Sequence, residues 1–252
     1  MNVSIHYTIS ELVAITKGKW LNKNPSVEQP AYLSLDSRKI TFPATTVFFA
    51  IKNKQQDANR FVDNLYQKGV RNFITDDRDI PIRKLALANV ILVDDTILAL
   101  QKLATFHRKK FVQSQLPVIG ITGSNGKTIV KEWLNQLLET DFTIVRSPKS
   151  FNSQIGVPLS VLNMNFTHDL AIFEAGISLS SEMKKLEKII NPTLGIFTNI
   201  GSAHDEGFKN RKQKINEKLI LFQNAQQIIF SADDEGLTHE IKKFEKYHDQ
   251  LQ

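Results

Sequence analysis

Apolar and polar positions follow two different patterns along the chain, one before and one after about residue 95. In the first part, a helix is predicted over 8–17, where Thr8 and Glu11 have the spacing of a capping box, and another over 59–68. Apolar runs predict strands at 32–35, 47–51, 70–75 and 90–93. We therefore expect a small mixed α/β domain over residues 1–95.

From residue 96 onwards, helices and strands alternate regularly, beginning with a helix over 96–111. Strands are predicted at 118–122, 143–145, 170–173, 194–198 and 228–230, and helices between them at 127–138, 154–162, 181–190 and 212–222. Strands separated by such helices form a parallel sheet, which binds ligands at the carboxyl ends of its strands. We predict a second α/β domain over 96–252, with its chemistry after Thr122, Phe173 and Thr198.

The amino-acid composition excludes several classes of protein. The 252 residues suit one large domain or two modest ones, and 41% hydrophobic with 23% charged residues is a globular mix that excludes a disordered chain. The chain has no cysteine, which excludes disulfides, thiolate zinc sites and a cysteine nucleophile. The amino terminus lacks the pattern of a secretory signal, and no apolar run is long enough to span a membrane. We expect a cytoplasmic protein.

The formal net charge of +6 raises the question of a polyanionic partner. Basic residues occur in short groups on predicted helix surfaces, without the interleaved aromatic residues of a platform for single-stranded nucleic acid. We interpret them as solvated helix faces and expect no nucleic-acid partner. Any anion that the protein recognises is expected to be a phosphorylated small molecule.

A phosphate loop is predicted at 123–128, where Gly-Ser-Asn-Gly-Lys-Thr lies between a strand and a helix. The glycines let backbone N–H groups approach an anion, the helix start adds positive potential, Lys127 reaches the terminal phosphates and Thr128 binds magnesium. The strict eight-residue pattern would place glycine at Ile121, so this is a shorter form. The alternative is a glycine turn before an ordinary helix, but the flanking strand and helix favour phosphate binding.

Two further polar residues follow predicted strands at the same edge of the sheet: Glu174 follows 170–173, and His204 comes a few residues after 194–198. A carboxylate and a neutral imidazole near a triphosphate are suitable ligands for a hard cation, although magnesium prefers oxygen. Taken alone, they would be a helix-capping Glu and a surface-loop His. Their coincidence with a phosphate loop favours a functional role.

Three other segments are ambiguous when judged from the residues alone. Asn152 and Ser153 precede a predicted helix, where they would hold a substrate or nucleotide phosphate or cap the helix. Lys218 would be an ordinary solvent-facing helix residue. The tripeptide Asp36-Ser37-Arg38 would bind a diphosphate through its Arg or form a common turn.

Taken in order, these segments resemble a Mur ligase, a member of the ATP-dependent amide-forming family of peptidoglycan synthesis. The matching segments are Asp36-Ser37-Arg38, Gly123 to Thr128, Glu174-Ala175-Gly176, Thr198-Asn199-Ile200 with Ala203-His204, and Lys218-x-x-Leu221-Phe222. Lys131-Glu132 and 151–159 are most similar to the MurF type, which adds D-alanyl-D-alanine to a UDP-N-acetylmuramoyl-tripeptide. The resemblance implies a first domain that binds a uridine nucleotide and an incomplete, mostly parallel-sheet P-loop ATPase domain.

The resemblance also implies a reaction and its residues. The tripeptide carboxylate would attack the γ-phosphate of ATP, and the amine of D-alanyl-D-alanine would then displace phosphate from the acyl phosphate. The implied catalytic residues are Lys127, Glu174, His204 and Lys218; those that bind nucleotide are Gly123, Ser124, Asn125, Gly126, Lys127, Thr128 and Asn199; those that bind substrate are Asp36, Ser37, Arg38, Asn152 and Ser153. Thr128, Glu174, His204 and a carbamylated Lys218 would hold Mg²⁺.

The chain departs from the family pattern in two places, and other interpretations stay open. Mur ligases continue into a third domain, whereas this chain stops at Gln252, so we expect the front part of a longer enzyme. Ser231 stands where relatives often have Asn before paired acids. The alternatives are a folylpolyglutamate synthetase, which lacks a leading domain with Asp36-Ser37-Arg38, a non-catalytic module that binds nucleotide or UDP-sugar, and a nucleic-acid-dependent ATPase, which net charge alone suggests.

Overall fold

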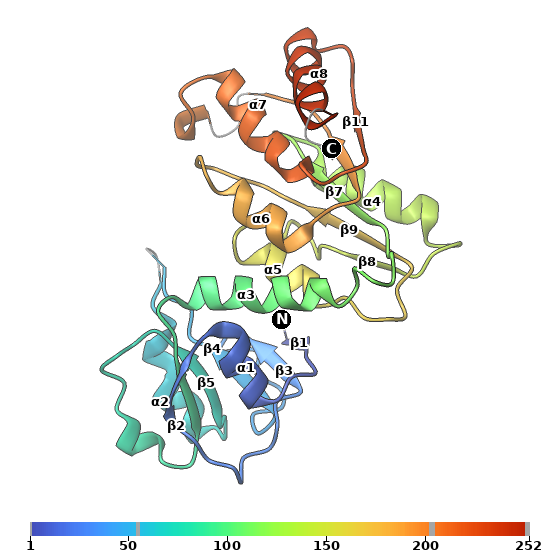
Figure 1. Cartoon of the computed structure of the whole chain (residues 1–252). Coiled ribbons are helices and arrows are strands. Elements are labelled where there is room, and N and C mark those ends of the chain that lie inside the picture. Colours follow the sequence, from blue (N-terminus) through green and yellow to red (C-terminus); the bar gives the residue numbers. More distant parts are fainter. Residues whose placement is uncertain (1, 54–55, 202–204, 250–252) are drawn as a thin grey trace. The chain divides into compact units, whose positions relative to one another are not determined.

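The structure is a computed structural model that describes residues 2–53, 56–201 and 205–249. The chain forms two compact units, Met1–Phe106 and His107–Gln252, and their elements are labelled in Figure 1. Among the described residues, no helix is long and apolar enough to cross a membrane.

The boundary between the units lies about ten residues later than the sequence predicts, because helix α3 (Thr96–Lys109) crosses it. Within the first unit, the Lys102 ammonium donates a hydrogen bond to the carbonyl of Thr16 at 3.1 Å. Within the second unit, the Arg108 guanidinium donates to the carbonyl of Ile190 at 2.9 Å. Most of this helix therefore belongs to the first unit.

The first unit is built on a six-stranded sheet in the order β1-β3-β4-β5-β6-β2. Strands β3 to β6 run parallel, whereas β1 and β2 lie antiparallel at the edges. The elements are β1 (Asn2–Ser4), α1 (Ile9–Thr16), β2 (Lys19–Asn22), β3 (Tyr32–Ser34), β4 (Thr46–Phe49), a 3-10 turn (Ala58–Phe61), α2 (Val62–Gln67), β5 (Asn72–Thr75), a 3-10 turn (Ile82–Leu85) and β6 (Asn89–Leu92).

The sequence predicts the inner parallel strands of the first unit but neither edge strand. The inner strands are recognisable because they consist of fully or mostly buried apolar runs. Strand β2 has no fully buried residue, so it carries no apolar pattern that marks it as a strand. The predicted capping box is confirmed: Thr8 accepts from the backbone N–H of Glu11, whose carboxylate accepts from the backbone N–H of Thr8.

The second unit contains a five-stranded, wholly parallel sheet in the order β11-β10-β7-β9-β8. Its elements are β7 (Val118–Thr122), α4 (Lys127–Leu138), β8 (Ile144–Arg146), α5 (Gly156–Val161), β9 (Leu170–Glu174), α6 (Met183–Ile190), β10 (Leu194–Phe197), a 3-10 turn (Asp205–Gly207), α7 (Arg211–Leu219), a 3-10 turn η4 (Ile220–Phe222), β11 (Gln227–Phe230) and α8 (Glu235–Asp249). The strand order changes direction at β7, so the carboxyl ends of β7 and β10 form a topological switch point, where such sheets bind ligands.

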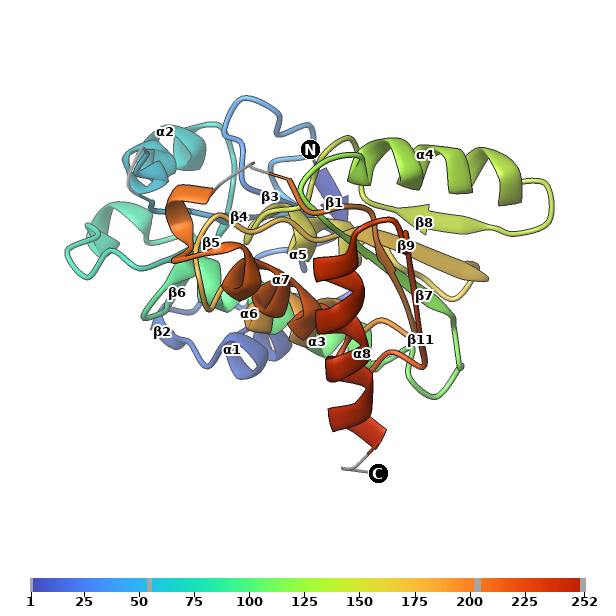
Figure 2. The same ribbon diagram turned by 90° about the horizontal axis from the view of Figure 1, so that it is seen from above.

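Helices cover both faces of this sheet, with α4 on one side and α6 and α7 on the other (Figure 2). The inner face of α4 packs through Val130 and Leu134 onto a core that includes Ile121. On the other face, Gly195 of β10 lets Phe222 come so close that a Cβ at Gly195 would lie 2.5 Å from the ring. This close approach fixes η4 against β10, and the end of α7 that precedes η4 is held with it.

Every strand and helix predicted after residue 110 is present, with ends that shift by at most three residues, and the predicted bounds of β7 and α4 are those observed. Helix α8 was not predicted, because its sequence is mostly polar and its fully buried apolar positions include only Leu237 and Ile241 among the described side chains. The prediction of a mixed α/β unit followed by a parallel-sheet unit is confirmed.

Candidate phosphate-binding site

The predicted phosphate loop connects the carboxyl end of β7 to the start of α4. Two of its glycines adopt positive φ angles, +144° at Gly123 and +80° at Gly126, which residues with a Cβ rarely adopt. A Cβ at Gly123 would also collide with the hydroxyl of Thr198. The loop therefore needs glycine at this position for its conformation and for its packing against the end of β10.

Residues that follow β10 hold the loop in place. The Thr198 hydroxyl donates to the carbonyl of Asn125 at 2.6 Å, and the backbone N–H of Ser124 donates to the carbonyl of Asn199 at 2.9 Å. The side-chain carbonyl of Asn199 accepts from the backbone N–H of Asn125 at 3.1 Å. Asn199, which was predicted to bind nucleotide, thus supports the shape of the loop through both its backbone and its side chain.

Lysine side chains from two helices converge on the same loop. Lys127, at the start of α4, donates to the carbonyl oxygens of Gly123 at 2.8 Å and Ser124 at 3.2 Å. Lys218, near the end of α7, donates to the same Gly123 oxygen at 3.1 Å and is only 2% exposed. Lys214, one turn earlier in α7, donates to the carbonyl of Gly201 at 2.6 Å and is also buried.

This convergence lowers the pKa of two of the amines. Burial, together with the charges of Lys127 and Lys214, lowers the pKa of Lys218 to about 7. Burial also lowers the pKa of Lys127, with a further contribution from Lys214 and an opposing one from Glu174. An anion bound at the loop would offset the repulsion between these ammonium groups, so the electrostatics favour a phosphate ligand.

Beside the lysines lies an oxygen pair that suits a hard cation. Glu174, the last residue of β9, is fully buried, and both of its carboxylate oxygens lie within 3.1 Å of the Thr128 hydroxyl. The ammonium of Lys131 donates to Glu174 Oε1 at 3.0 Å. The carboxylate and hydroxyl oxygens, completed by phosphate oxygens, are the donor set that magnesium prefers.

The predicted metal ligand His204 lies outside the described residues. Among the residues that the structure describes, no group of three or more His, Cys, Asp or Glu side chains is arranged to hold a metal ion. The oxygen pair of Thr128 and Glu174 is therefore the part of the predicted metal site that the geometry supports.

The two residues predicted before α5 differ in what they contact. The Asn152 amide nitrogen lies 3.4 Å from Glu174 Oε2, and the Asn152 carbonyl accepts from the backbone N–H of Gly176 at 2.8 Å. The Ser153 hydroxyl accepts from the backbone N–H of Gly156 at 3.1 Å, which is the contact of a helix cap. Asn152 therefore belongs to the surroundings of Glu174, whereas the observed contact of Ser153 is the capping one.

Asp36, Ser37 and Arg38 form a turn after β3 in the first unit, apart in sequence from every residue of the loop. The Arg38 guanidinium donates two hydrogen bonds to the Asp36 carboxylate, at 2.9 and 3.0 Å, although its side chain is 83% exposed. The bonds from Arg38 lower the pKa of Asp36 to about 2. The turn thus presents a guanidinium in a fixed orientation and open to solvent.

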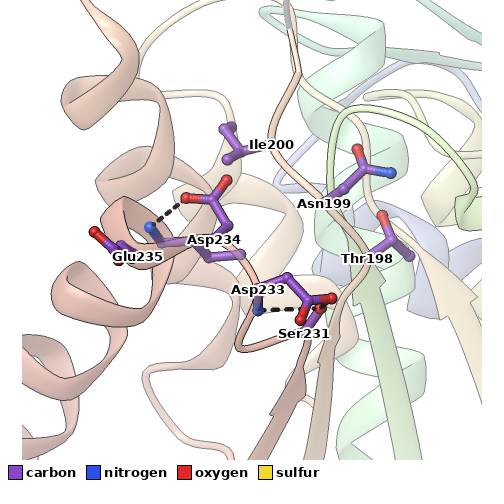
Figure 3. Close-up of a pocket in the computed structure, with 8 residues that line it drawn as sticks. Thr198, Asn199, Ile200, Ser231, Asp233, Asp234 and Glu235 are labelled. Carbon is purple, nitrogen blue, oxygen red and sulfur yellow. Dashed lines mark hydrogen bonds between the residues drawn. The ribbon is translucent and has the colours of Figure 1, made fainter.

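A cavity of about 460 Å³ adjoins the phosphate loop at the carboxyl ends of β10 and β11. Figure 3 shows Thr198 and Asn199 on one side of it and the turn from Ser231 to Glu235 on the other. The Ser231 hydroxyl donates to the Asp233 carboxylate at 2.8 Å, and Asp234 accepts from the backbone N–H of Leu237 at 2.9 Å at the start of α8. A second compartment therefore lies next to the two residues, Thr198 and Asn199, that hold the loop.

Sequence reasoning missed three parts of this site: Lys214, the contact between Lys131 and Glu174, and the cavity. Lys214 had a signal, because it lies four residues before Lys218 and therefore on the same face of a helix. Lys131 was noticed as a family marker but given no role, since its partners at 147–149 and 174 are distant in sequence.

A sequence profile described as the Mur ligase middle domain matches residues 121–249, which include the loop, the lysines, Glu174 and the cavity. The chain belongs to the Mur ligase family. Within this family, the chain is 32% identical over 235 residues to the UDP-N-acetylmuramoyl-tripeptide--D-alanyl-D-alanine ligase of Bacillus subtilis, a match that covers 91% of this chain and 50% of the relative.

Solved structures of Mur ligases agree with this assignment. MurF from Acinetobacter baumannii superimposes with a TM-score of 0.83 at 28% identity, covering 97% of this chain and 52% of that one. MurF from Thermotoga maritima, solved in complex with ADP, has a TM-score of 0.71 at 28% identity and covers 84% of this chain and 48% of that one. The chain spans about half the length of the relatives it matches.

The lowered pKa of Lys218 predicts a pH-dependent stability. Between pH 7 and the ordinary lysine value of 10.5, the folded protein binds fewer protons at Lys218 than the unfolded chain does, so the free energy of unfolding rises with pH. Lys218→Met removes this titration. We expect the stability of the wild type relative to the variant to rise by roughly 2–3 kcal/mol between about pH 6 and pH 9, measured by urea unfolding. An equal difference at both pH values would show that Lys218 titrates normally.

Proposed function

We propose that this chain forms the substrate- and nucleotide-binding part of an ATP-dependent ligase that adds D-alanyl-D-alanine to a UDP-N-acetylmuramoyl-tripeptide. One observation carries the proposal: the ammonium groups of Lys127 and Lys218 meet at the Gly123 carbonyl of the phosphate loop, with Lys214 on the Gly201 carbonyl nearby and the oxygen pair of Thr128 and Glu174 beside them. The names of the relatives from Bacillus subtilis and Acinetobacter baumannii supply the substrates, and the ADP complex of the Thermotoga maritima protein supports the nucleotide.

The chemistry that we propose proceeds in two balanced steps. A carboxylate oxygen of the tripeptide attacks the γ-phosphorus of ATP, and ADP leaves with the electron pair of the broken P–O bond. The amine of D-alanyl-D-alanine then attacks the acyl carbon, and inorganic phosphate leaves while the nitrogen loses a proton. Both steps develop negative charge on phosphate oxygens, which fixed cations stabilise.

We propose a separate role in this reaction for each part of the site. Lys127 turns from the carbonyls of Gly123 and Ser124 to the β- and γ-phosphates. The backbone N–H groups of Ser124 and Asn125 are bound to Asn199, so those at the start of α4 are the ones that approach the phosphates. Thr128 and Glu174 hold Mg²⁺, which when bound neutralises phosphate charge. We propose His204 and Lys218 as ligands of a second ion. The cavity between Asn199 and Asp233 then takes the rest of the nucleotide.

The Lys127→Ala variant of this chain should bind Mg·ATP roughly 10- to 100-fold more weakly, the range for losing hydrogen bonds to a charged group, with little change in thermal stability. Calorimetry with Mg·ATP, a UDP-muramoyl peptide and single-stranded DNA measures this. Lys184→Ala, a change at an exposed position of α6, is the matched control and should leave binding unchanged. Unchanged Mg·ATP binding by the folded Lys127→Ala variant would contradict the phosphate-loop assignment.

We propose that the first unit binds the uridine diphosphate end of the substrate through Asp36, Ser37 and Arg38. The solvent-exposed guanidinium, oriented by Asp36, has the geometry to pair with a phosphate.

Replacing Arg38 by Ala tests this proposal. We expect Arg38→Ala to weaken binding of the UDP-muramoyl peptide by roughly tenfold or more, while the affinity for Mg·ATP stays unchanged. Arg83→Ala, another exposed position of the first unit, serves as the control in the same calorimetric titrations. Equal loss of both ligands would instead assign Arg38 a role in folding.

We propose that Lys218 is carbamylated in the working enzyme. The neutral amine adds to the carbon of CO₂ and releases a proton, giving a negatively charged carbamate. Burial and the nearby charges of Lys127 and Lys214 favour the neutral amine, and the same two cations would stabilise an anionic product. The product replaces three like charges by two cations and an anion, which supplies oxygen ligands that a plain lysine lacks.

The carbamate should be visible directly. With ¹³C-bicarbonate, Mg²⁺ and ADP at about pH 8, we expect a carbamate signal in the ¹³C NMR spectrum of the wild type that Lys218→Met lacks. Any carbamate at the amino terminus remains in both spectra and serves as the internal control. Identical spectra for the two proteins would contradict carbamylation.

A further inference from the structure

Lys131 is a fully buried lysine that the proposed chemistry does not use. It lies in α4, one turn after Lys127, but it points away from the phosphate loop into the space between α4, β8 and β9. Its ammonium donates to the carbonyl of Ser147 at 2.7 Å, to the carbonyl of Lys149 and to Glu174 Oε1 at 3.0 Å. Glu132 Oε1 also lies 3.0 Å from this ammonium, so four oxygens share its three donors.

The bond to Glu174 fixes one oxygen of this carboxylate. Both side chains are fully buried, so the ion pair is isolated from water and resists exchange for solvent. With Oε1 held by Lys131, both carboxylate oxygens lie within 3.1 Å of the Thr128 hydroxyl, and Oε2 is also 3.4 Å from the Asn152 amide. Lys131 therefore fixes the orientation of the Glu174 carboxylate beside Thr128.

The same ammonium also anchors the segment that carries Asn152. Its partner Lys149 has a left-handed backbone, with φ of +50°, which is unfavourable for a residue with a Cβ. Ser147 is bound twice, because its carbonyl accepts from Lys131 and its hydroxyl accepts from the backbone N–H of Glu174 at 3.2 Å. One buried charge thus links α4, the end of β9 and the segment 147–152.

We propose that Lys131 is a positioning residue for the divalent cation: it holds Glu174 and the segment 147–152 in the arrangement that places a carboxylate oxygen beside Thr128. The inference rests on the proposed function, because it assigns Glu174 to the metal of a bound nucleotide. Groups that orient a metal ligand in this way commonly change metal affinity by about 10- to 100-fold when they are removed. A purely structural ion pair would instead change the stability of the fold and leave metal affinity intact in the folded protein.

The test measures Mn²⁺ binding to the ADP-bound chain by electron paramagnetic resonance, beside calorimetry with ADP in the absence of metal. For Lys131→Met, we expect metal-free ADP affinity within about threefold of wild type and Mn²⁺ affinity lower by at least about tenfold. Glu132→Gln is the matched control, since Glu132 contacts the same ammonium at 3.0 Å but is partly exposed and is not proposed to hold the metal. We expect Glu132→Gln to bind Mn²⁺ like the wild type.

Chemical rescue keeps the test informative if Lys131→Met does not fold. The chain has no cysteine, so Lys131→Cys introduces a unique thiol that can be alkylated in the unfolded state. Alkylation with 2-bromoethylamine restores an ammonium at nearly the original length, whereas 2-bromoethanol gives a neutral side chain of the same length. We expect the aminoethyl form to recover Mn²⁺ affinity to within about threefold of wild type and the hydroxyethyl form to bind metal-free ADP but to remain weak for Mn²⁺.

The outcomes separate this inference from the proposed function. Wild-type Mn²⁺ affinity in folded Lys131→Met, or in the hydroxyethyl form, would overturn the positioning role and leave nucleotide binding in place. Failure of the wild type to bind ADP would overturn the proposed function and the inference with it. Loss of Mn²⁺ binding that returns only with the ammonium supports the positioning role.

Discussion

The carbonyl oxygen of Gly123 accepts hydrogen bonds from two lysine ammonium groups, and the rest of the site is arranged around this shared contact. Lys127 and Lys218 come from different helices, yet both reach this oxygen within 3.1 Å. Bringing a buried and a partly buried cation together is unfavourable unless an anion accompanies them, as the lowered pKa of Lys218 indicates. A phosphate at the loop would supply that anion. The pairing of Lys127 with Lys218, which is electrostatically unfavourable in the free protein, would therefore favour the binding of a nucleotide.

The packing of the second unit makes this convergence possible. Gly195 lets Phe222 lie directly on β10, which fixes the end of α7 and with it Lys218. On the opposite face, α4 carries Lys127 and Lys131 on successive turns, directed to the loop and to Glu174 respectively. Two lysines four residues apart therefore have different roles. Lys127 lies at the start of α4, next to the loop, whereas the side chain of Lys131 is fully buried.

The sequence predicts those parts of the site that depend on neighbours in the chain. The phosphate loop was recognisable because glycine, Lys127 and Thr128 follow a buried strand within a few residues. Lys218 was identified by resemblance to a family, since as an isolated helix residue it carries no signal. Lys131 and the cavity beyond Asn199 depend on segments that only the fold brings together, so their roles needed the structure. The course of α3 across the boundary between the units likewise depends on contacts remote in sequence.

A crystal structure of this chain with Mg²⁺ and a non-hydrolysable ATP analogue tests the central claim most directly. We predict that the β- and γ-phosphates occupy the loop at 123–128, that Lys127 leaves the Gly123 carbonyl to contact them, and that the metal lies between a phosphate oxygen, Thr128 and Glu174. Phosphates bound elsewhere, or an occupied loop in which Lys127 and Lys218 both remain on the Gly123 carbonyl, would contradict the account.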